Sequence, residues 1–487
     1  MDDIRQSIET TAAPASGSAR VQRAAGHEIE RYSKLFAQRT QVMRASAMRD
    51  LMALTARDDV ISFAGGLPDT STFAPGFFTE LMSRVATENA ARALQYGPTE
   101  GLASVREAIA CVMEAEGMDA DPDCIMPTSG GQQALDLICK IMIDPGDVII
   151  TEAPTYPGAV PTFCSYQAEV VQVPMDEHGM RIDALRQALA LLDSQGQRPK
   201  FIYTIPNFHN PAGVTMSLDR RQELVRIAGD RELLVVEDNP YGLLRYEGDP
   251  LPPLYALDQK FVIYASTFSK ILSPGLRLGW LAAPAPVLAK LILAKGSTDL
   301  CSSSVSQYFV AEYFQSGPWL DYVRSLTKLY RSRRDAMLGA LSEFFPAEAT
   351  WTQPQGGLFL WATLPSYIDT TDLLASAISK RVAFVPGRAA YVDGRGGSSM
   401  RLNFSGVKEQ EIREGIRRLG EVIKAQVAFY GALGGHTSAV AQHAEVTPRP
   451  SAAARPEAKP QTAAGGETAE HQAALTNVLP LTRRRAS

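Results

Sequence analysis

Leu233-Leu-Val-Val-Glu-Asp238 is an apolar run that ends on a carboxylate, and it is followed by Ser-Thr-Phe-Ser-Lys270 and by Gly-Leu-Arg277-Leu-Gly. An apolar run of this length between helical stretches predicts a buried strand of an α/β sheet. Ligands of such sheets bind beyond the carboxyl ends of the strands, which is where Asp238 falls. We therefore expect Asp238, Lys270 and Arg277 to bring a carboxylate, an amine and a guanidinium to one site.

These three side chains match a cofactor that has a pyridine ring, an aldehyde and a phosphate. A lysine can form a Schiff base with the aldehyde, and a carboxylate can hold the ring nitrogen protonated so that the ring accepts electrons. A guanidinium binds phosphate in a bidentate manner, and Thr267 and Ser269 offer hydroxyls to the same group. Taken alone, Lys270 is more simply a surface lysine. With these neighbours it predicts an enzyme that uses pyridoxal phosphate (PLP).

A second phosphate signal lies in Thr-Ser129-Gly-Gly, which leads into a predicted helix over residues 132–140. The free N–H groups and the dipole at a helix N-terminus make an anion site. A serine N-cap explains Ser129 equally well. Together with Arg277, the Gly-Gly helix start favours a phosphate site.

Two loops carry candidate contacts to the cofactor ring. The loop Pro206–Gly213 is rich in turn residues, so a plain connection is its simplest interpretation. Its Asn210 could nevertheless donate to a phenolate oxygen, and Tyr241, three residues after Asp238, could supply a second donor. Tyr156 could stack on the pyridine ring, with a buried core tyrosine as the alternative.

Arg401 lies between apolar residues on a predicted strand near the end of the folded region. Burying an unpaired guanidinium is costly, so Arg401 should have an anionic partner. A structural Asp or Glu could serve. We favour the α-carboxylate of a substrate, because a bidentate arginine is the usual partner of that group.

The order of elements predicts two folded domains. Short apolar runs alternate with helical stretches over residues 61–320 and indicate a large domain with a buried, mostly parallel sheet. A long helix from residue 318 leads into a smaller α+β domain, 321–430. Residues 1–28 predict a flexible leader, 29–60 a helical arm that joins the small domain, and 431–487 a disordered tail.

Composition excludes several classes of protein. The 487 residues carry a net charge of −5, with 45% hydrophobic and 21% charged residues, which argues against a nucleic-acid binder. No apolar run approaches the length of a membrane span, and no secretory signal is apparent. The five cysteines lack ligand spacing, so we expect reduced thiols in a cytoplasmic protein. His209 has no second ligand at metal spacing, and we expect no metal site.

Several motifs, in family order, resemble the class I, fold-type I PLP aminotransferases, and most closely the kynurenine/2-aminoadipate aminotransferase subgroup. These motifs are Ile61–Asp69, Leu94–Gly101, Pro206–Gly213 and Ser266–Lys270, within a resemblance that covers residues 40–425. It implies a large domain with a mostly parallel seven-stranded sheet, a smaller α+β domain, PLP as cofactor and a homodimer with shared active sites. Gly131 stands where some relatives have Ser, which removes a hydroxyl and keeps the amide.

The resemblance also implies roles for individual residues. Lys270 would be the Schiff-base lysine that moves the catalytic proton, with Asp238 on the pyridine nitrogen and Tyr241 on the phenolate oxygen. The other cofactor contacts would be Gly131, Gln132, Tyr156, Asn210, Thr267, Ser269, Arg277 and, from the neighbouring subunit, Tyr96. The substrate contacts would be Arg401, Arg49, Gly66 and Asn210.

The implied reaction moves an α-amino group between an amino acid and a 2-oxo acid, with 2-oxoglutarate as the expected acceptor. Donors that resemble 2-aminoadipate, aromatic donors and branched-chain donors stay open, because pocket shape selects among them. A decarboxylase or lyase on the same scaffold would need the same cofactor contacts. A PLP-sensing regulator is a further alternative, although the residues before the fold show no basic helix-turn-helix pattern.

Overall fold

The computed structural model describes residues 32, 34–43 and 59–433. The predicted leader, most of the predicted arm and the tail from residue 434 onward lie outside these described residues. Within 34–43, the predicted arm contains a 3-10 helix, η1 (Gln38–Gln41), in place of a continuous α-helix. Leu35 and Phe36 are exposed there. A helix that buries no apolar face is not stabilised in water, which explains the difference.

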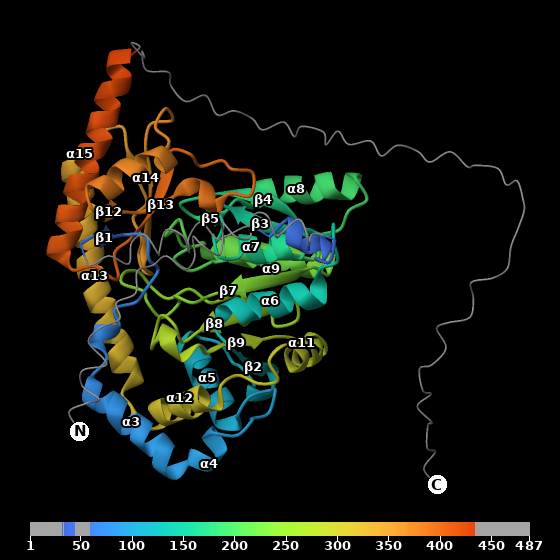
Figure 1. Ribbon diagram of the computed structural model, residues 1–487. Helices are drawn as coiled ribbons and strands as arrows, with labels where there is room; N and C mark the ends of the chain where they lie inside the picture. Colours follow the sequence, from blue (N-terminus) through green and yellow to red (C-terminus); the bar gives the residue numbers. More distant parts are fainter. Residues whose placement is uncertain (1–31, 33, 44–58, 434–487) are drawn as a thin grey trace, which may run out of the picture. The chain divides into compact units, whose positions relative to one another are not determined.

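An eight-stranded mixed sheet forms the centre of the larger part of the fold (Figure 1). In spatial order its strands are β2 (Ile125–Thr128), β9 (Gly279–Ala282), β8 (Val262–Thr267), β7 (Leu234–Asp238), β6 (Phe201–Thr204), β3 (Val148–Ala153), β4 (Glu169–Asp176) and β5 (Gly179–Met180). Neighbours from β8 to β4 are parallel, whereas β9 is antiparallel to both β2 and β8. The fold class is confirmed, with eight strands in place of seven, because the chain turns back after β4 and adds the two-residue β5 at the edge.

Alternate residues of the central strands face two apolar layers. Ile149 and Tyr203 pack with the helices of one layer, whereas Ile150 and Ile202 face the other. The first layer contains α6 (Gly131–Met142), α7 (Val160–Ser165) and α11 (Ala285–Thr298). The second contains α5 (Ala103–Ala115), α8 (Ile182–Ser194), α9 (Leu218–Arg231), α10 (Leu254–Leu257) and α12 (Ser304–Ser316). Burial on both faces explains why these strands are continuous apolar runs.

A four-stranded antiparallel sheet forms the smaller part, in the order β10 (Thr350–Trp351), β11 (Phe359–Thr363), β14 (Ser399–Asn403) and β13 (Val385–Pro386). The long helix predicted from residue 318 is α13 (Trp319–Phe344), which packs along α15 (Glu409–Leu433) (Figure 1). Helix α14 (Thr370–Ser379) completes this part, and β1 (Ile61–Ser62) pairs in parallel with β12 (Val382–Ala383). This part combines helices with an antiparallel sheet, as the predicted α+β class requires.

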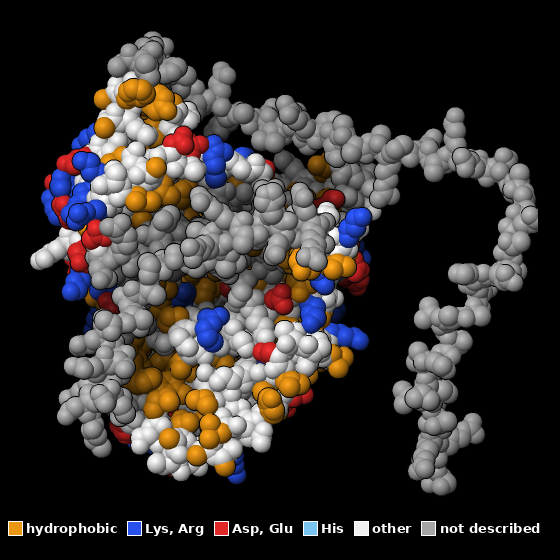
Figure 2. All heavy atoms as spheres, viewed as in Figure 1, with side chains coloured by type: hydrophobic (Ala, Val, Ile, Leu, Met, Phe, Trp, Pro, Cys, Tyr) orange, Lys and Arg blue, Asp and Glu red, His pale blue; other side chains and the backbone are white. Residues whose placement is uncertain are grey.

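The remaining elements are α3 (Pro75–Glu88), α4 (Ala90–Ala93) and four 3-10 helices, η2 (Thr70–Thr72), η3 (Pro122–Cys124), η4 (Pro274–Leu276) and η5 (Gly387–Ala390). Hydrophobic side chains gather around α3, α4 and α12 on the face shown in Figure 2. Phe78 and Met82 of α3, and Leu94 and Tyr96 just after α4, are exposed. Among the described residues, no helix has both the length and the apolar character that crossing a membrane requires.

Candidate active site

A cavity of about 250 Å³ lies at the carboxyl ends of β6, β7 and β8, beside the N-terminus of α6. Its lining residues are Gly131, Gln132, Leu135, Tyr156, Ile205, Asn210, Asp238, Pro240, Tyr241, Thr267, Ser269, Lys270 and Arg277. Every residue predicted to contact the cofactor is therefore in this wall, except Tyr96. Side chains from five separate segments meet here because parallel strands end at the same edge of the sheet.

Lys270 enters the cavity from the turn that follows β8. Its Nζ donates a hydrogen bond of 2.7 Å to the carbonyl of Gly66. Burial, together with the cations Arg401 and Arg277, lowers the pKa of Lys270 to about 8, while Asp238 acts in the opposite direction. About a tenth of this amine is therefore neutral at pH 7 and about half at pH 8, and the neutral form is the one that a nucleophile or a proton acceptor requires.

Asp238 ends β7 and faces the same cavity. One carboxylate oxygen, Oδ2, accepts a hydrogen bond of 2.6 Å from the hydroxyl of Tyr203 on the neighbouring strand β6. Burial raises the pKa of Asp238 to about 6, while the bond from Tyr203 and the nearby His209 oppose that rise. The carboxylate is thus mostly ionised at neutral pH and able to hold a cation.

The phosphate corner is built from the start of α6 and the turn that carries Arg277. Gly130 is the N-cap of α6, with φ at 81°, and a Cβ there would collide with the Arg277 guanidinium. Arg277 itself has φ at 49° and donates from Nη2 to the carbonyl of Ser129 at 3.3 Å. The hydroxyls of Thr267 and Ser269 lie 2.9 Å apart beside it. A guanidinium, two hydroxyls and a helix N-terminus converge here, which suits a phosphate.

The serine N-cap that offered an alternative for Ser129 is wrong. Gly130 occupies the N-cap position, and the Ser129 hydroxyl donates to Asp299 Oδ2 at 2.9 Å. Sequence inspection could not find this partner, because Asp299 lies far along the chain.

Arg401 reaches the cavity region from β14 of the smaller sheet. It is buried, and it donates to Asn210 Oδ1 at 2.9 Å and to the carbonyl of Ala64 at 2.7 Å. Its guanidinium lies 4.4 Å from the centre of the Phe359 ring. Burial lowers the pKa of Arg401 to about 10, so it stays a cation at neutral pH. The arginine thereby links the smaller sheet to the Asn210 loop.

Asn210 and Tyr241 lie together, with 3.5 Å between the Asn210 amide nitrogen and the Tyr241 hydroxyl. The loop that carries Asn210 is clamped by Arg221, a fully buried residue of α9. The Arg221 guanidinium donates to the carbonyls of Met216 and Pro206 and to the Asn207 side chain. The sequence showed only a charged residue in a helix and gave no sign of this clamp.

His209 is held in the same loop by Glu152, and both are buried. Its Nε2 lies 3.0 Å from Glu152 Oε2, and its Nδ1 accepts a bond of 3.2 Å from the Ala212 N–H. Since Nδ1 accepts from a backbone N–H, Nε2 is the ring nitrogen that carries a proton, and it lies beside the carboxylate. These contacts place His209 in the support of the loop.

Of the predicted site residues that the structure describes, Arg401, Gly66 and Tyr96 stand apart from the lining. Gly66 contributes its carbonyl to Lys270, and a Cβ at this position would lie 3.1 Å from the Phe359 ring. Tyr96 is 78% exposed within the single chain. Arg49 lies outside the described residues.

The residues present fit PLP. A half-buried amine with a lowered pKa, a half-buried carboxylate and the phosphate corner lie in one cavity, as the aldehyde, ring nitrogen and phosphate of that cofactor require. Tyr156 supplies an aromatic wall.

Comparison with known proteins assigns the chain to a family. The model of the family "Aminotransferase class I and II" matches residues 59–419. Aromatic-amino-acid aminotransferase 1 of Thermococcus litoralis is 46% identical over 398 residues, which cover 81% of this chain and 95% of the relative. The 2-aminoadipate transaminase of Thermus thermophilus is 36% identical over 402 residues, covering 82% and 98%. The crystal structure of a kynurenine aminotransferase from Pyrococcus horikoshii, in complex with PMP, superimposes with a TM-score of 0.78 at 44% identity and covers 82% of this chain and 98% of that one. The chain belongs to the class I and II aminotransferases, which use pyridoxal phosphate.

Proposed function

We propose that this aminotransferase takes the α-amino group from an aromatic, 2-aminoadipate-like or branched-chain amino acid and passes it to a 2-oxo acid, with 2-oxoglutarate as the expected acceptor. The observation that carries the proposal is that Lys270, with its lowered pKa, shares one cavity with Asp238 and the phosphate corner. The printed names of the relatives, for aromatic amino acids, 2-aminoadipate and kynurenine, support the range of donors.

The cavity residues divide the work. PLP, when bound, supplies an electron sink for the charge that develops at the substrate's α-carbon. Lys270 would hold the cofactor through its aldehyde, and its Nζ, when free, would take the proton from the substrate's α-carbon. Asp238 would keep the ring nitrogen protonated, and Arg277 with the start of α6 would hold the phosphate. Arg401 orients the substrate through its α-carboxylate.

The test is a half-reaction. The purified holoenzyme is mixed with one amino acid at a time, without any 2-oxo acid, and the visible absorption of bound PLP is followed. Loss of the visible band and appearance of the near-ultraviolet band of pyridoxamine phosphate would support transamination and name the donor. A visible band that persists with every aromatic, aminoadipate-like and branched-chain amino acid would contradict the proposal. Release of CO₂ would indicate a decarboxylase on this scaffold.

We further propose that the enzyme works as a cytoplasmic homodimer. The exposed Tyr96 and the apolar surface around α3, α4 and α12 support a second copy of the chain as the partner (Figure 2). Five free cysteines suit a reducing compartment. We also propose that the chain divides into two domains at residue 320. Both sheets lie within one compact unit.

The lowered pKa of Lys270 predicts how the apoenzyme captures PLP as the pH changes. Below its pKa of about 8 the amine is protonated and cannot attack the aldehyde, and above it the amine is neutral. The second-order rate of PLP capture should therefore rise about tenfold per pH unit from pH 6 and level off above about pH 8. Stopped-flow absorption measures this rate. An inflection near pH 10, the ordinary value for lysine, would contradict it.

Tyr203→Phe should lower kcat/KM by about ten- to a hundredfold, because a hydrogen bond to a buried charged group is lost. Tyr203 does not line the cavity, so it acts by positioning Asp238 and by opposing the rise of its pKa. Steady-state kinetics measures the change. The acid limb of the pH profile of kcat/KM should move to higher pH, because the pKa of Asp238 rises when the hydrogen bond is lost.

The matched control is Tyr166→Phe. Tyr166 also donates to a carboxylate, Asp136 Oδ1 at 3.1 Å, on the same side of the sheet and outside the cavity wall. This variant should keep wild-type kinetics. Equal losses in the two variants would mean that Tyr203 matters only for folding.

A further inference from the structure

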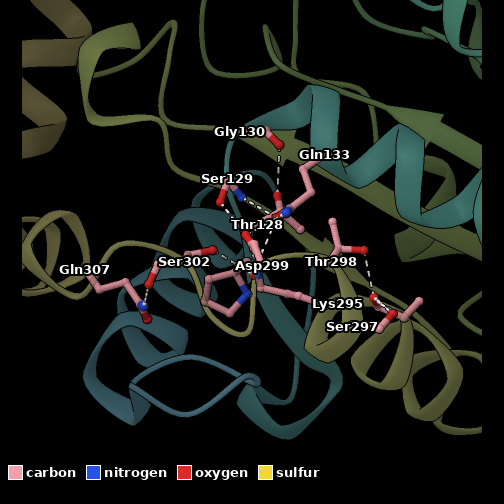
Figure 3. A network of polar contacts seen from close by, with 12 residues as sticks. Thr128, Ser129, Gly130, Gln133, Lys295, Ser297, Thr298, Asp299, Ser302 and Gln307 are labelled. Atoms are coloured by element: carbon pink, nitrogen blue, oxygen red, sulfur yellow. Dashed lines mark hydrogen bonds and ion pairs between the residues drawn. The ribbon is translucent and has the colours of Figure 1, made fainter. Parts of the chain in front are cut away.

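The loop before α6 is held from behind by side chains of α11 (Figure 3). Asp299, directly after α11, accepts at Oδ2 from the Ser129 hydroxyl at 2.9 Å and from Gln133 Nε2 at 2.6 Å. Gln133 Oε1 in turn accepts from the Ser129 N–H at 2.7 Å and from Lys295 Nζ at 2.9 Å. Ser129 is thus held by hydrogen bonds from both its hydroxyl and its backbone amide.

Lys295 and Asp299 form an ion pair one helical turn apart, in which the ammonium group is buried and the carboxylate is partly exposed. Lys295 is completely buried, and its Nζ lies 2.9 and 3.0 Å from the two carboxylate oxygens of Asp299. Partial burial would raise the pKa of Asp299, but hydrogen bonds from Gln133, Lys295 and Ser129 outweigh burial and lower it. The charge of Lys295 balances that of Asp299, so the carboxylate can hold the loop without repelling a nearby phosphate.

This arrangement decides which amides remain for the phosphate. The Ser129 N–H is committed to Gln133, and the Gly130 N–H donates to the carbonyl of Thr128. The N–H groups of Gly131 and Gln132 are the first two of α6 and have no acceptor within the helix. Both residues line the cavity, so their N–H groups are the ones available to a phosphate there.

We propose that the Lys295–Asp299 pair is the positioning device of the phosphate corner: it fixes Ser129 so that the amides of Gly131 and Gln132 and the Arg277 guanidinium converge on the phosphate. Neither side chain lines the cavity, so both act through Ser129 and Gln133. The inference rests on the proposed placement of the phosphate at Arg277 and α6.

The test compares two ligands of the apoenzyme, PLP and pyridoxal, which differ only in the phosphate. Asp299→Ala should weaken PLP binding by about ten- to a hundredfold, since charge-assisted hydrogen bonds are lost, while pyridoxal binding stays within about threefold of wild type. Lys295→Met should have the same selective effect. Ser129→Ala, which removes one of the hydrogen bonds and leaves the ion pair intact, should give a smaller loss and serves if the charged variants fail to fold. Equilibrium absorption titration gives all of these affinities.

Lys140→Met is the matched control. Lys140 Nζ binds the hydroxyls of Ser297 and Thr298 on the same end of α11 and does not contact the loop. This variant should bind both ligands as the wild type does. The positioning role is overturned if Asp299→Ala and Ser129→Ala bind PLP with wild-type affinity, or if their affinities for PLP and pyridoxal fall equally.

Arg277→Ala separates this inference from the proposal beneath it. If Arg277→Ala loses affinity for PLP but not for pyridoxal, and Asp299→Ala shows no such selective loss, the positioning role is overturned and the phosphate site is kept. No selective loss in Arg277→Ala would overturn the placement of the phosphate itself.

Discussion

Lys270→Ala should lower the turnover of amino acid by about 10⁴-fold or more, because Lys270, the only amine among the described residues of the cavity wall, supplies both the covalent attachment and the proton transfer. The cofactor should still bind, since Asp238, Arg277 and the hydroxyl groups of the phosphate corner are untouched. Single-turnover measurements with a saturating amino acid would give the rate, and the cofactor content of the purified variant would show that the site is occupied.

Two variants control for Lys270→Ala. Lys270→Arg keeps a cation and much of the volume but stays protonated at neutral pH, so it should be as inactive as the alanine variant. Lys290→Ala removes an exposed lysine from α11 and should leave the kinetics unchanged. Activity above about one per cent in Lys270→Ala would contradict the assignment of Lys270 as the amine that moves the proton.

The site could be predicted where its signal was local. Asp238 ends a short apolar run, which is the buried strand β7, and Lys270 lies in the turn directly after the buried strand β8. The Gly-Gly pair before residues 132–140 predicted the start of α6. The order of the motifs predicted nearly all the residues that line the cavity. Strand ends and turn residues are set by their own neighbours in sequence, which makes them visible without a structure.

The supporting contacts could not be predicted, because they join residues that are far apart in sequence. Tyr203 and Asp238 are 35 positions apart, and Ser129 and Asp299 are 170 apart. Nothing in Phe-Ile-Tyr203-Thr distinguishes a tyrosine that bonds to a carboxylate from one that fills the core. The register of β6 against β7 decides which role Tyr203 has. It pairs Tyr203 with Val236, two residues before Asp238, so Tyr203 and Asp238 share one face of the sheet.

Asp238→Asn should lower kcat by about a thousandfold while PLP binding weakens much less. The amide has the shape of the carboxylate and can still accept the Tyr203 hydrogen bond, so only the charge is removed. Two unit charges about 4 Å apart at an effective dielectric of about 20 interact by about 4 kcal/mol, which corresponds to about three orders of magnitude. The phosphate corner stays intact, so cofactor affinity and turnover should separate. Equilibrium binding of PLP and single-turnover rates measure the two quantities.

Asp136→Asn is the matched control for Asp238→Asn, because Asp136 also accepts from a tyrosine hydroxyl and lies outside the cavity wall. The double variant with Tyr203→Phe gives a sharper test. Tyr203 acts only through the Asp238 carboxylate, so in the Asp238→Asn background Tyr203→Phe should cost less than about threefold, against its ten- to hundredfold effect alone. Additive losses in the double variant would mean that Tyr203 acts by a second route. In Asp238→Asn alone, a loss of PLP affinity as large as the loss of kcat would mean that Asp238 holds the cofactor without activating it.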